Sequence, residues 1–282
     1  MTPTPAQHEN PSPPNLGKAF DLYARDYDQF YQADAADVRS FDYRNRRQIA
    51  LRLADDLLPP RASLLEFGCG AGHTAVELAR RGYKMVCVDI SEQMVSATQR
   101  TMSEAQQPAE VRLGTVADVP LECGPFDGVL AMGVMDYIAQ PPETLARVVE
   151  LLKPGGICLL SFTNAATPVR WIELPLKRAA ALGLYAATRD ARYRDIAFPM
   201  SHAHTRRQVC AWYAQAGLTC ESFEYFGFGL RFGSRSIPPL SWVQRWNAAL
   251  GQSRVRALGR GFVAVGRKPV EPAGPEASSK RD

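Results

Sequence analysis

The segment LLEFGCGAGH, residues 64–73, joins a short apolar run to three closely spaced glycines. Glycine permits a tight strand-to-helix turn and lets a ligand approach the backbone without meeting a Cβ atom. The helix that follows such a turn offers unpaired amide groups in its first turn. The segment therefore predicts a buried strand that ends in a ligand-binding turn.

Apolar runs and helical stretches alternate on both sides of this turn. Strands are predicted at residues 63–67, 84–90, 111–116, 126–134, 157–162, 218–226 and 261–265. Helices are predicted at 40–58, 75–81, 91–105, 143–152 and 205–216, with Ser91 as an N-cap. This alternation is typical of βαβ units and a parallel sheet, in which ligands bind beyond the carboxyl ends of the strands.

Further landmarks accompany the glycine turn in a fixed order. They are Glu66 before the first glycine, Asp89 at the end of the second strand, Asp118 after the third, Phe126-Asp127 opening the fourth, and LKPGG at 152–156 before the fifth. With the spacing Gly68-x-Gly70-x-Gly72, this order between residues 64 and 162 resembles the class I S-adenosylmethionine-dependent methyltransferases.

The resemblance implies an α/β fold: a doubly wound, seven-stranded, mostly parallel, Rossmann-like sheet whose last strand is antiparallel, with helical cap inserts. It implies S-adenosyl-L-methionine as the cofactor. The residues expected to bind it are Tyr23, Glu66, Gly68, Gly70, Gly72, Asp89, Ile90, Asp118 and Val119. Asp89 would accept hydrogen bonds from both ribose hydroxyls, Asp118 would lie near the adenine amine, and Glu66 near the methionine part. Glu66 as a simple cap of the turn is the alternative.

Four aromatic residues precede the sheet at helical spacing. Phe20, Tyr23, Tyr27 and Phe30 fall three and four residues apart, so they share one face of a helix. This helix resembles the N-terminal segment that closes over the cofactor in small-molecule methyltransferases, and Tyr27 is then expected to contact the substrate. A helix that packs on the core is the alternative.

Candidate catalytic residues lie after the fourth strand and at the end of a long insert. Asp136 and Tyr137 are expected to orient the acceptor, with Asp136 as a candidate catalytic group; a turn cap and a packed ring are their alternatives. His202 and His204 alternate on an extended segment, so they point the same way. Because histidine titrates near neutral pH, either could be the general base of an O-methylation, and surface positions are their alternative.

Two inserts suggest the acceptor. The stretch 169–187 is rich in Trp, Leu and Ile, and residues 225–270 contain arginines and a lysine but no acidic residue. Together they predict an apolar pocket with a basic rim. The expected acceptor is an amphipathic or acidic small molecule, such as a quinone precursor, a polyketide or another secondary metabolite. Solvated helix faces and a lipid acceptor at a membrane surface are the alternatives.

The domain interpretation is a single methyltransferase domain at 16–268 between a disordered leader, 1–15, and a disordered tail, 269–282. Within it we expect an N-terminal helical cap (16–60), a core (61–164), a cap insert (165–204), and a C-terminal core with the Arg-rich insert (205–268). The six cysteines lie far apart without metal-site spacing, which predicts reduced thiols, no metal and a cytoplasmic protein.

Composition and motifs also bear on partners. A net charge of +4 and the absence of a recognisable second module favour a small-molecule substrate over nucleic acid. No stretch has the roughly 20 apolar residues of a membrane span, which leaves peripheral association open; the oligomeric state is also open. An NAD-dependent oxidoreductase shares the strand–glycine–helix layout, but the position of Gly72 and the Pro-Gly-Gly turn argue against it. A non-catalytic subunit with this fold is a further alternative.

Overall fold

The computed structural model describes residues 16–21, 24, 31, 38–189, 202–232, 235–237, 239–250 and 256–270. The predicted leader and all of the predicted tail beyond Val270 lie outside these residues. So do Tyr23 and Tyr27, the aromatic residues expected to contact cofactor and substrate.

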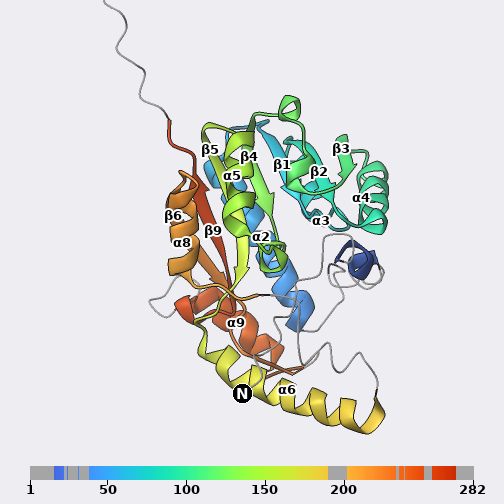
Figure 1. The fold of residues 1–282 in the computed structure, drawn as a ribbon, viewed down its shortest axis with the longest axis vertical. Coiled ribbons are helices and arrows are strands. Elements are labelled where there is room, and N and C mark those ends of the chain that lie inside the picture. The colour runs from blue at the N-terminus through green and yellow to red at the C-terminus, as the bar shows by residue number, and fades with distance from the viewer. Residues whose placement is uncertain are drawn as a thin grey trace, which may run out of the picture.

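A seven-stranded sheet has the order β3-β2-β1-β4-β5-β9-β6. Its strands are β1 Ser63–Phe67, β2 Lys84–Asp89, β3 Ala109–Leu113, β4 Phe126–Ala131, β5 Leu152–Thr163, β6 Thr219–Phe226 and β9 Gly261–Arg267 (Figure 1). The first five pair in parallel, and β9 runs antiparallel to both β5 and β6. The predicted fold, including the antiparallel last strand, is confirmed.

Helices cover both faces of the sheet because successive strand residues point to opposite sides. Leu64 packs with α2 (Val38–Leu57) and α3 (His73–Arg80) in one core cluster. Leu65 packs with α5 (Pro141–Leu151) and α8 (Arg206–Gln215) in another. Helix α4 (Glu92–Glu104) begins at the predicted cap, where the Ser91 hydroxyl accepts a hydrogen bond from the Met94 amide. The core is therefore doubly wound.

Several boundaries differ from the sequence prediction by a few residues, and the local reason is clear at β5 and at the end of β3. Strand β5 begins at Leu152 rather than residue 157, because Leu152 pairs with Phe126 and Ile157 with Gly128. The residues between them form an irregularity inside the strand, with Gly155 at φ +79°. Strand β3 ends at Leu113 because Gly114 turns the chain with φ +143° into a 3-10 turn, η1 Val116–Asp118.

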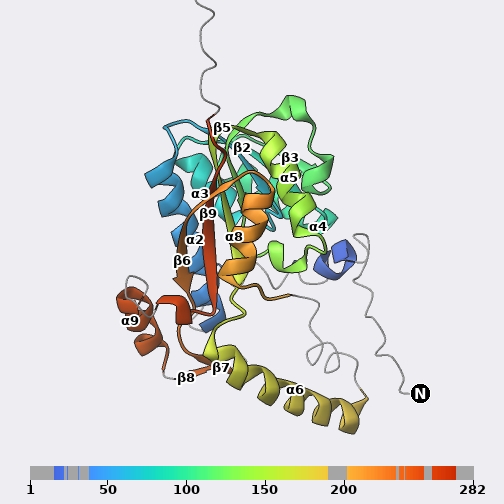
Figure 2. The ribbon, with the colours of Figure 1, turned by 60° about the vertical axis from the view of Figure 1, so that its left-hand side comes forward.

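Additional elements gather where β5 and β6 end and β9 begins. Helix α6 (Pro168–Thr188) is continuous through Pro175 and extends beyond the sheet (Figure 1). A two-stranded hairpin, β7 (Leu230–Phe232) and β8 (Arg235–Ile237), leads to α9 (Leu240–Leu250), which lies at the same end (Figure 2). Helix α6 lies in the described part of the predicted cap insert, and residues 190–201 of that insert lie outside the described residues.

Candidate cofactor and acceptor site

A cavity of about 450 Å³ opens at the carboxyl ends of β1, β2 and β4. Its wall includes Glu66 and Asp89, which stand near the ends of β1 and β2, and Met132, which directly follows β4. Parallel α/β sheets bind ligands at this edge. The predicted position of the ligand site therefore coincides with a cavity.

The glycine turn forms one side of this first cavity with a left-handed backbone. Gly68, Gly70 and Gly72 have φ values of +67°, +57° and +80°. A Cβ atom on Gly68 would lie 2.2 Å from Cγ2 of Val134, so a side chain would collide with the opposite wall. Glycine is required there both by the backbone conformation and by the close approach of the two loops.

Glu66 is a buried carboxylate in the wall of the first cavity. Burial raises its pKa from 4.5 to about 8, and the charge of Asp89 adds to the rise. Hydrogen bonds from Thr74 and from the Ala75 amide, and the charge of Arg46, oppose this shift. Its Oε2 atom is buried without a hydrogen-bond partner among the described residues. A buried acceptor oxygen of this kind is suited to a hydrogen-bond donor or a cation.

Asp89 orders the opposite side of the turn. Its Oδ2 accepts the Gly70 amide at 2.9 Å and its Oδ1 accepts the Ser91 amide at 3.0 Å. Burial raises the pKa of this carboxyl, and the two amides lower it. A carboxylate has about four acceptor positions, so both oxygens can accept further bonds from a ligand. Ile90 lines the cavity beside it.

Asp118 and Val119 lie elsewhere. The Asp118 carboxylate accepts hydrogen bonds from the amide and hydroxyl of Thr115, both at 2.7 Å, in a capping box on its own 3-10 turn. These bonds lower its pKa. Val119 is 1% exposed and packs in the hydrophobic core. Neither residue lines the first cavity, whereas Gly114, Thr115, Val116 and Ala117 of the same loop do.

The N-terminal helical turn closes part of the first cavity. Leu16 and Phe20 line it, and the Phe20 ring meets Tyr137 edge-on at 5.2 Å between centroids. Asp21 accepts the Ser91 hydroxyl at 2.6 Å and the Gln93 amide at 3.2 Å, which holds the turn against the start of α4. This position supports the predicted role of the segment as a cover.

A second cavity of about 210 Å³ adjoins the first, and both are lined by Gly133 and Tyr137. Asp136 lines only the second and is 8% exposed. Its Oδ1 accepts the Thr163 amide at 2.9 Å, and its Oδ2 accepts the Thr163 hydroxyl at 2.6 Å. Burial raises the pKa of Asp136, while the Thr163 bonds and the charges of Arg46 and Arg170 lower it.

Comparison with known proteins places this geometry in a family. The chain matches the methyltransferase domain family over residues 31–222. It belongs to the methyltransferase family. The predicted class I, S-adenosylmethionine-dependent methyltransferase is thereby confirmed, and the NAD-dependent alternative gains no support.

Named relatives of this methyltransferase include two ubiquinone biosynthesis O-methyltransferases. The one from Xanthomonas axonopodis pv. citri is 28% identical over 166 residues, covering 58% of this chain and 66% of the relative. The one from Caulobacter vibrioides is 35% identical over 103 residues, covering 36% of this chain and 41% of the relative. The aligned parts thus span between about two fifths and two thirds of these relatives.

Solved structures share the fold of the methyltransferase at low identity. Magnesium protoporphyrin IX methyltransferase from Synechocystis PCC 6803, with bound SAH, has a TM-score of 0.59 and 15% identity, covering 91% of this chain and 100% of that one. A possible histamine N-methyltransferase from Thermotoga maritima has a TM-score of 0.56 and 17% identity, covering 90% and 99%.

The first cavity suits the cofactor of this methyltransferase family. S-adenosylmethionine carries a sulfonium and an ammonium group, and the acidic lining residues Glu66, Asp89 and Glu143 outnumber the one arginine, Arg147, in the described wall. The buried Oε2 of Glu66, which has no hydrogen-bond partner among the described residues, can accept a hydrogen bond from such a ligand. These residues of the chain can hold the predicted cofactor.

The histidines predicted as bases line neither cavity. His204 is 7% exposed and packs edge-on against Phe162 and Trp212, with ring centroids 5.8 and 5.0 Å apart. Burial lowers its pKa, as does the charge of His202. His202 is exposed. The surface alternative therefore fits His202, whereas His204 is a buried, packed ring, which neither the base role nor the surface alternative describes.

Two wall residues were not expected from the sequence. Tyr31 and His73 both line the first cavity, and their rings stack at 4.5 Å between centroids. Burial raises the pKa of Tyr31, against a hydrogen bond and the charge of Arg46. His73 directly follows the last glycine and is the first residue of α3. Its place next to the glycine turn could therefore have predicted that it lines the cavity. Tyr31 has no such signal, because only tertiary packing brings it to the turn.

Proposed function

We propose that this methyltransferase transfers the methyl group of S-adenosyl-L-methionine to a hydroxyl oxygen of a small amphipathic acceptor. A quinone precursor, a polyketide or another secondary metabolite would fit this description. The observation that carries the proposal is the buried Asp136 carboxylate in a small polar cavity that shares Gly133 and Tyr137 with the cofactor cavity.

The chemistry requires little of the protein besides alignment and removal of a proton. When bound, S-adenosylmethionine supplies a methyl group on a sulfonium sulfur, and transfer to a hydroxyl releases neutral S-adenosylhomocysteine and one proton. Asp136 is the candidate to accept that proton, because a hydroxyl becomes a good nucleophile only as it is deprotonated. Thr163 holds both carboxylate oxygens in place, and Tyr137 is positioned to orient the acceptor.

The names of the Xanthomonas and Caulobacter relatives support an oxygen acceptor for this chain. The roles of Glu66, Gly68, Gly70, Gly72, Asp89 and Ile90 in cofactor binding belong to the same proposal, because all six stand at the first cavity or its glycine turn. Asp118 and Val119 could contribute only through the backbone of the turn that they cap and anchor.

The test uses methyl-labelled cofactor, the purified full chain and an extract of its native host. We expect label to enter a discrete small molecule that partitions into organic solvent. Tandem mass spectrometry of the product should then locate the methyl group on an oxygen atom. Tight binding of S-adenosylhomocysteine without any transfer to extract components would instead support the non-catalytic alternative.

A lipid acceptor at a membrane surface is the second candidate. Among the described residues no helix combines the length and apolar character needed to span a bilayer. However, α6 and α9 lie at one end of the molecule (Figure 2). Both helices expose large apolar side chains, including Trp171 at 68% and Trp242 at 55% exposure. Exposed tryptophans are typical of interfacial binding. Sedimentation with vesicles of anionic phospholipid distinguishes a lipid acceptor from a dissolved one. An enzyme that methylates a freely dissolved acceptor should stay in the supernatant.

A further inference from the structure

We infer that the second cavity is the binding site for the head group of the methyl acceptor, and that this head group is an uncharged, hydroxylated ring. The inference rests on the proposed function, since it assigns the acceptor's place and charge within that reaction. Both amphipathic and acidic acceptors were considered above. The inference favours an amphipathic acceptor with a neutral head group over an acidic one.

The second cavity is separated from the first by the loop that contains Gly133. Gly133 lines both and has φ +86°. A Cβ atom there would lie 2.5 Å from Nη1 of Arg46. Its amide donates to the Ser161 hydroxyl at 2.7 Å, which fixes the loop in this conformation. A thin glycine wall therefore stands between the two cavities, so groups bound on either side of it would be close together.

Charged side chains in the described wall of the second cavity balance one another. Asp42 and Asp136 face Arg46 and Arg260. Arg260 is further bound by Glu173, with Nη1 to Oε2 at 2.7 Å and Nη2 to Oε1 at 2.9 Å. Glu173 adds a third carboxylate, and Arg170, whose charge also acts on Asp136, adds a third guanidinium group. An anionic head group would add an unpaired charge to this half-buried site, which is costly; a neutral one would not.

The basic residues of the acid-free stretch do not change this balance. Arg267 pairs with Glu221 at the opposite end of β9. Lys268 donates to the carbonyl oxygens of Val149 and Leu152, both at 2.8 Å. Only Arg260 of this stretch lines the second cavity among the described residues, and its charge is already matched by Glu173.

The walls of the second cavity combine flat apolar faces with hydrogen-bonding groups. Its aromatic lining residues are Tyr43, Tyr137, Phe162 and Phe226. Ser161 and Thr163, two residues apart on β5, point to the same side, and Thr163 holds Asp136. A space of about 210 Å³ suits one ring better than a chain of rings. The ring's hydroxyl would donate to the carboxylate, whose two oxygens have further acceptor capacity.

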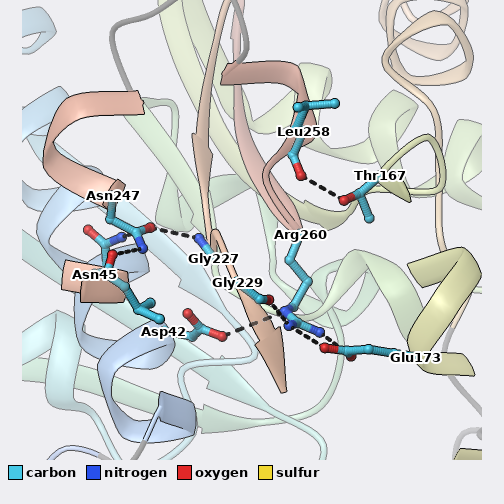
Figure 3. Close-up of polar contacts among 10 residues, drawn as sticks. Asp42, Asn45, Thr167, Glu173, Gly227, Gly229, Asn247, Leu258 and Arg260 are labelled. Carbon is cyan, nitrogen blue, oxygen red and sulfur yellow. Dashed lines mark hydrogen bonds and ion pairs between the residues drawn. The ribbon is translucent and has the colours of Figure 1, made fainter. Parts of the chain in front are cut away.

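Arg260 connects the parts of the chain that enclose this cavity (Figure 3). Besides Glu173 of α6, its guanidinium donates to the Gly229 carbonyl at 2.6 Å and lies 3.9 Å from the Asp42 carboxylate of α2. Nearby, Thr167 donates to the Leu258 carbonyl at 2.6 Å, and Asn247 of α9 accepts the Gly227 amide at 2.9 Å. Arg260 is thus a positioning residue that joins both inserts to the cavity wall.

The experiment measures binding to the full chain saturated with S-adenosylhomocysteine, by calorimetry at pH 7. The probes are 4-methylcatechol and 3,4-dihydroxybenzoate, which share a hydroxylated ring and differ in charge. We expect the neutral probe to bind at least about tenfold more tightly. Arg260→Gln should weaken its binding at least about fivefold while leaving S-adenosylhomocysteine affinity unchanged, and Arg260→Lys should recover part of the loss. Arg267→Gln, the matched control at the far end of β9, the strand that Arg260 directly precedes, should change neither.

Equal or tighter binding of 3,4-dihydroxybenzoate would overturn the inference, as would absence of binding by both probes to the S-adenosylhomocysteine complex. An unchanged affinity in Arg260→Gln would overturn the role of Arg260. If that variant does not fold, the near-isosteric Thr163→Val decides, with weaker binding of the neutral probe expected. Failure of S-adenosylhomocysteine itself to bind would instead contradict the proposed function.

Discussion

The backbone amide of His202 donates a 2.7 Å hydrogen bond to the carbonyl oxygen of Asp136. The amide of His204 likewise donates to the Thr163 carbonyl at 2.8 Å, and the Ala165 amide returns a bond to the His204 carbonyl at 3.0 Å. The two ends of the insert therefore brace Asp136 and Thr163 through main-chain atoms. Because these bonds are made by main-chain atoms, they remain when the side chains at positions 202 and 204 are replaced. Substitutions there therefore distinguish the structural role of the segment from a catalytic role for imidazole.

Replacing the histidines should affect stability more than turnover. His202→Ala should leave the rate within about twofold of the parent value, because its side chain is exposed and lines neither cavity. His204→Ala removes a buried ring and should lower the free energy of unfolding by about 1–3 kcal/mol. Chemical denaturation and initial rates at saturating acceptor measure the two effects. A loss of turnover in a fully folded His204→Ala protein would restore histidine as a candidate base.

Asp136→Asn should reduce kcat by about 10²- to 10⁴-fold, the usual contribution of a general base. S-adenosylhomocysteine affinity should not change, since Asp136 does not line the first cavity. Titration calorimetry and single-turnover rates distinguish these effects. Equal turnover by Asp136→Asn would mean that another group, or water, removes the proton.

Thr163→Val should move the acidic limb of the pH–rate profile to higher pH. The base must be ionised, and the Thr163 hydroxyl lowers the pKa of Asp136 by donating to its charged form. Removing that donor raises the pKa, so activity is lost at a higher pH as the solution is acidified. A limb that stays in place would assign it to a different group.

The sequence was sufficient to predict those features of the fold that depend on residues close together in the chain. The strand at 63–67 and the Ser91 cap lie as predicted, because apolar patterning and capping are local properties. Asp118 shows the limit of a motif: it follows the third strand as expected, yet its carboxylate closes a capping box with Thr115. A short acidic side chain after a strand can either bind a ligand or cap a turn. Which of the two it does depends on the conformation of the loop.

The second cavity could not have been predicted in this way. Asp42, Asp136 and Thr163 come from α2, η3 (Met135–Tyr137) and β5, and Arg260 directly precedes β9. No spacing in the sequence connects them, and the pairing of Arg260 with Glu173 depends on where α6 packs. The basic rim was predicted from a count of charges without their partners, and the sequence did not show that Arg260 pairs with Glu173 or Arg267 with Glu221.

Gly68→Ala should abolish cofactor binding through one steric contact. The added Cβ would lie 2.2 Å from Val134 Cγ2, at a residue with φ +67°. The double variant Gly68→Ala with Val134→Ala removes that contact but keeps the backbone strain. We expect it to regain part of the S-adenosylhomocysteine affinity and to remain less stable than the parent, by about 1 kcal/mol or more. No recovery at all would assign the whole effect to the left-handed backbone.

Glu66 should make cofactor binding depend on pH below 8. In the cofactor-free protein its pKa is about 8, so at neutral pH the carboxyl is mostly protonated. The proposed contact with the ammonium group of the cofactor's methionine part, which S-adenosylhomocysteine retains, favours the ionised form, and binding should therefore release a proton. By linkage, S-adenosylhomocysteine affinity should rise about tenfold per pH unit up to pH 8 and then level off.

Calorimetry at pH 7 in buffers of different ionisation enthalpy measures the number of protons released on binding. We expect nearly one for the parent protein. For Glu66→Gln we expect none, and an affinity that no longer rises with pH. Equal proton release by Glu66→Gln would assign the titration to another group and remove Glu66 from the cofactor contact.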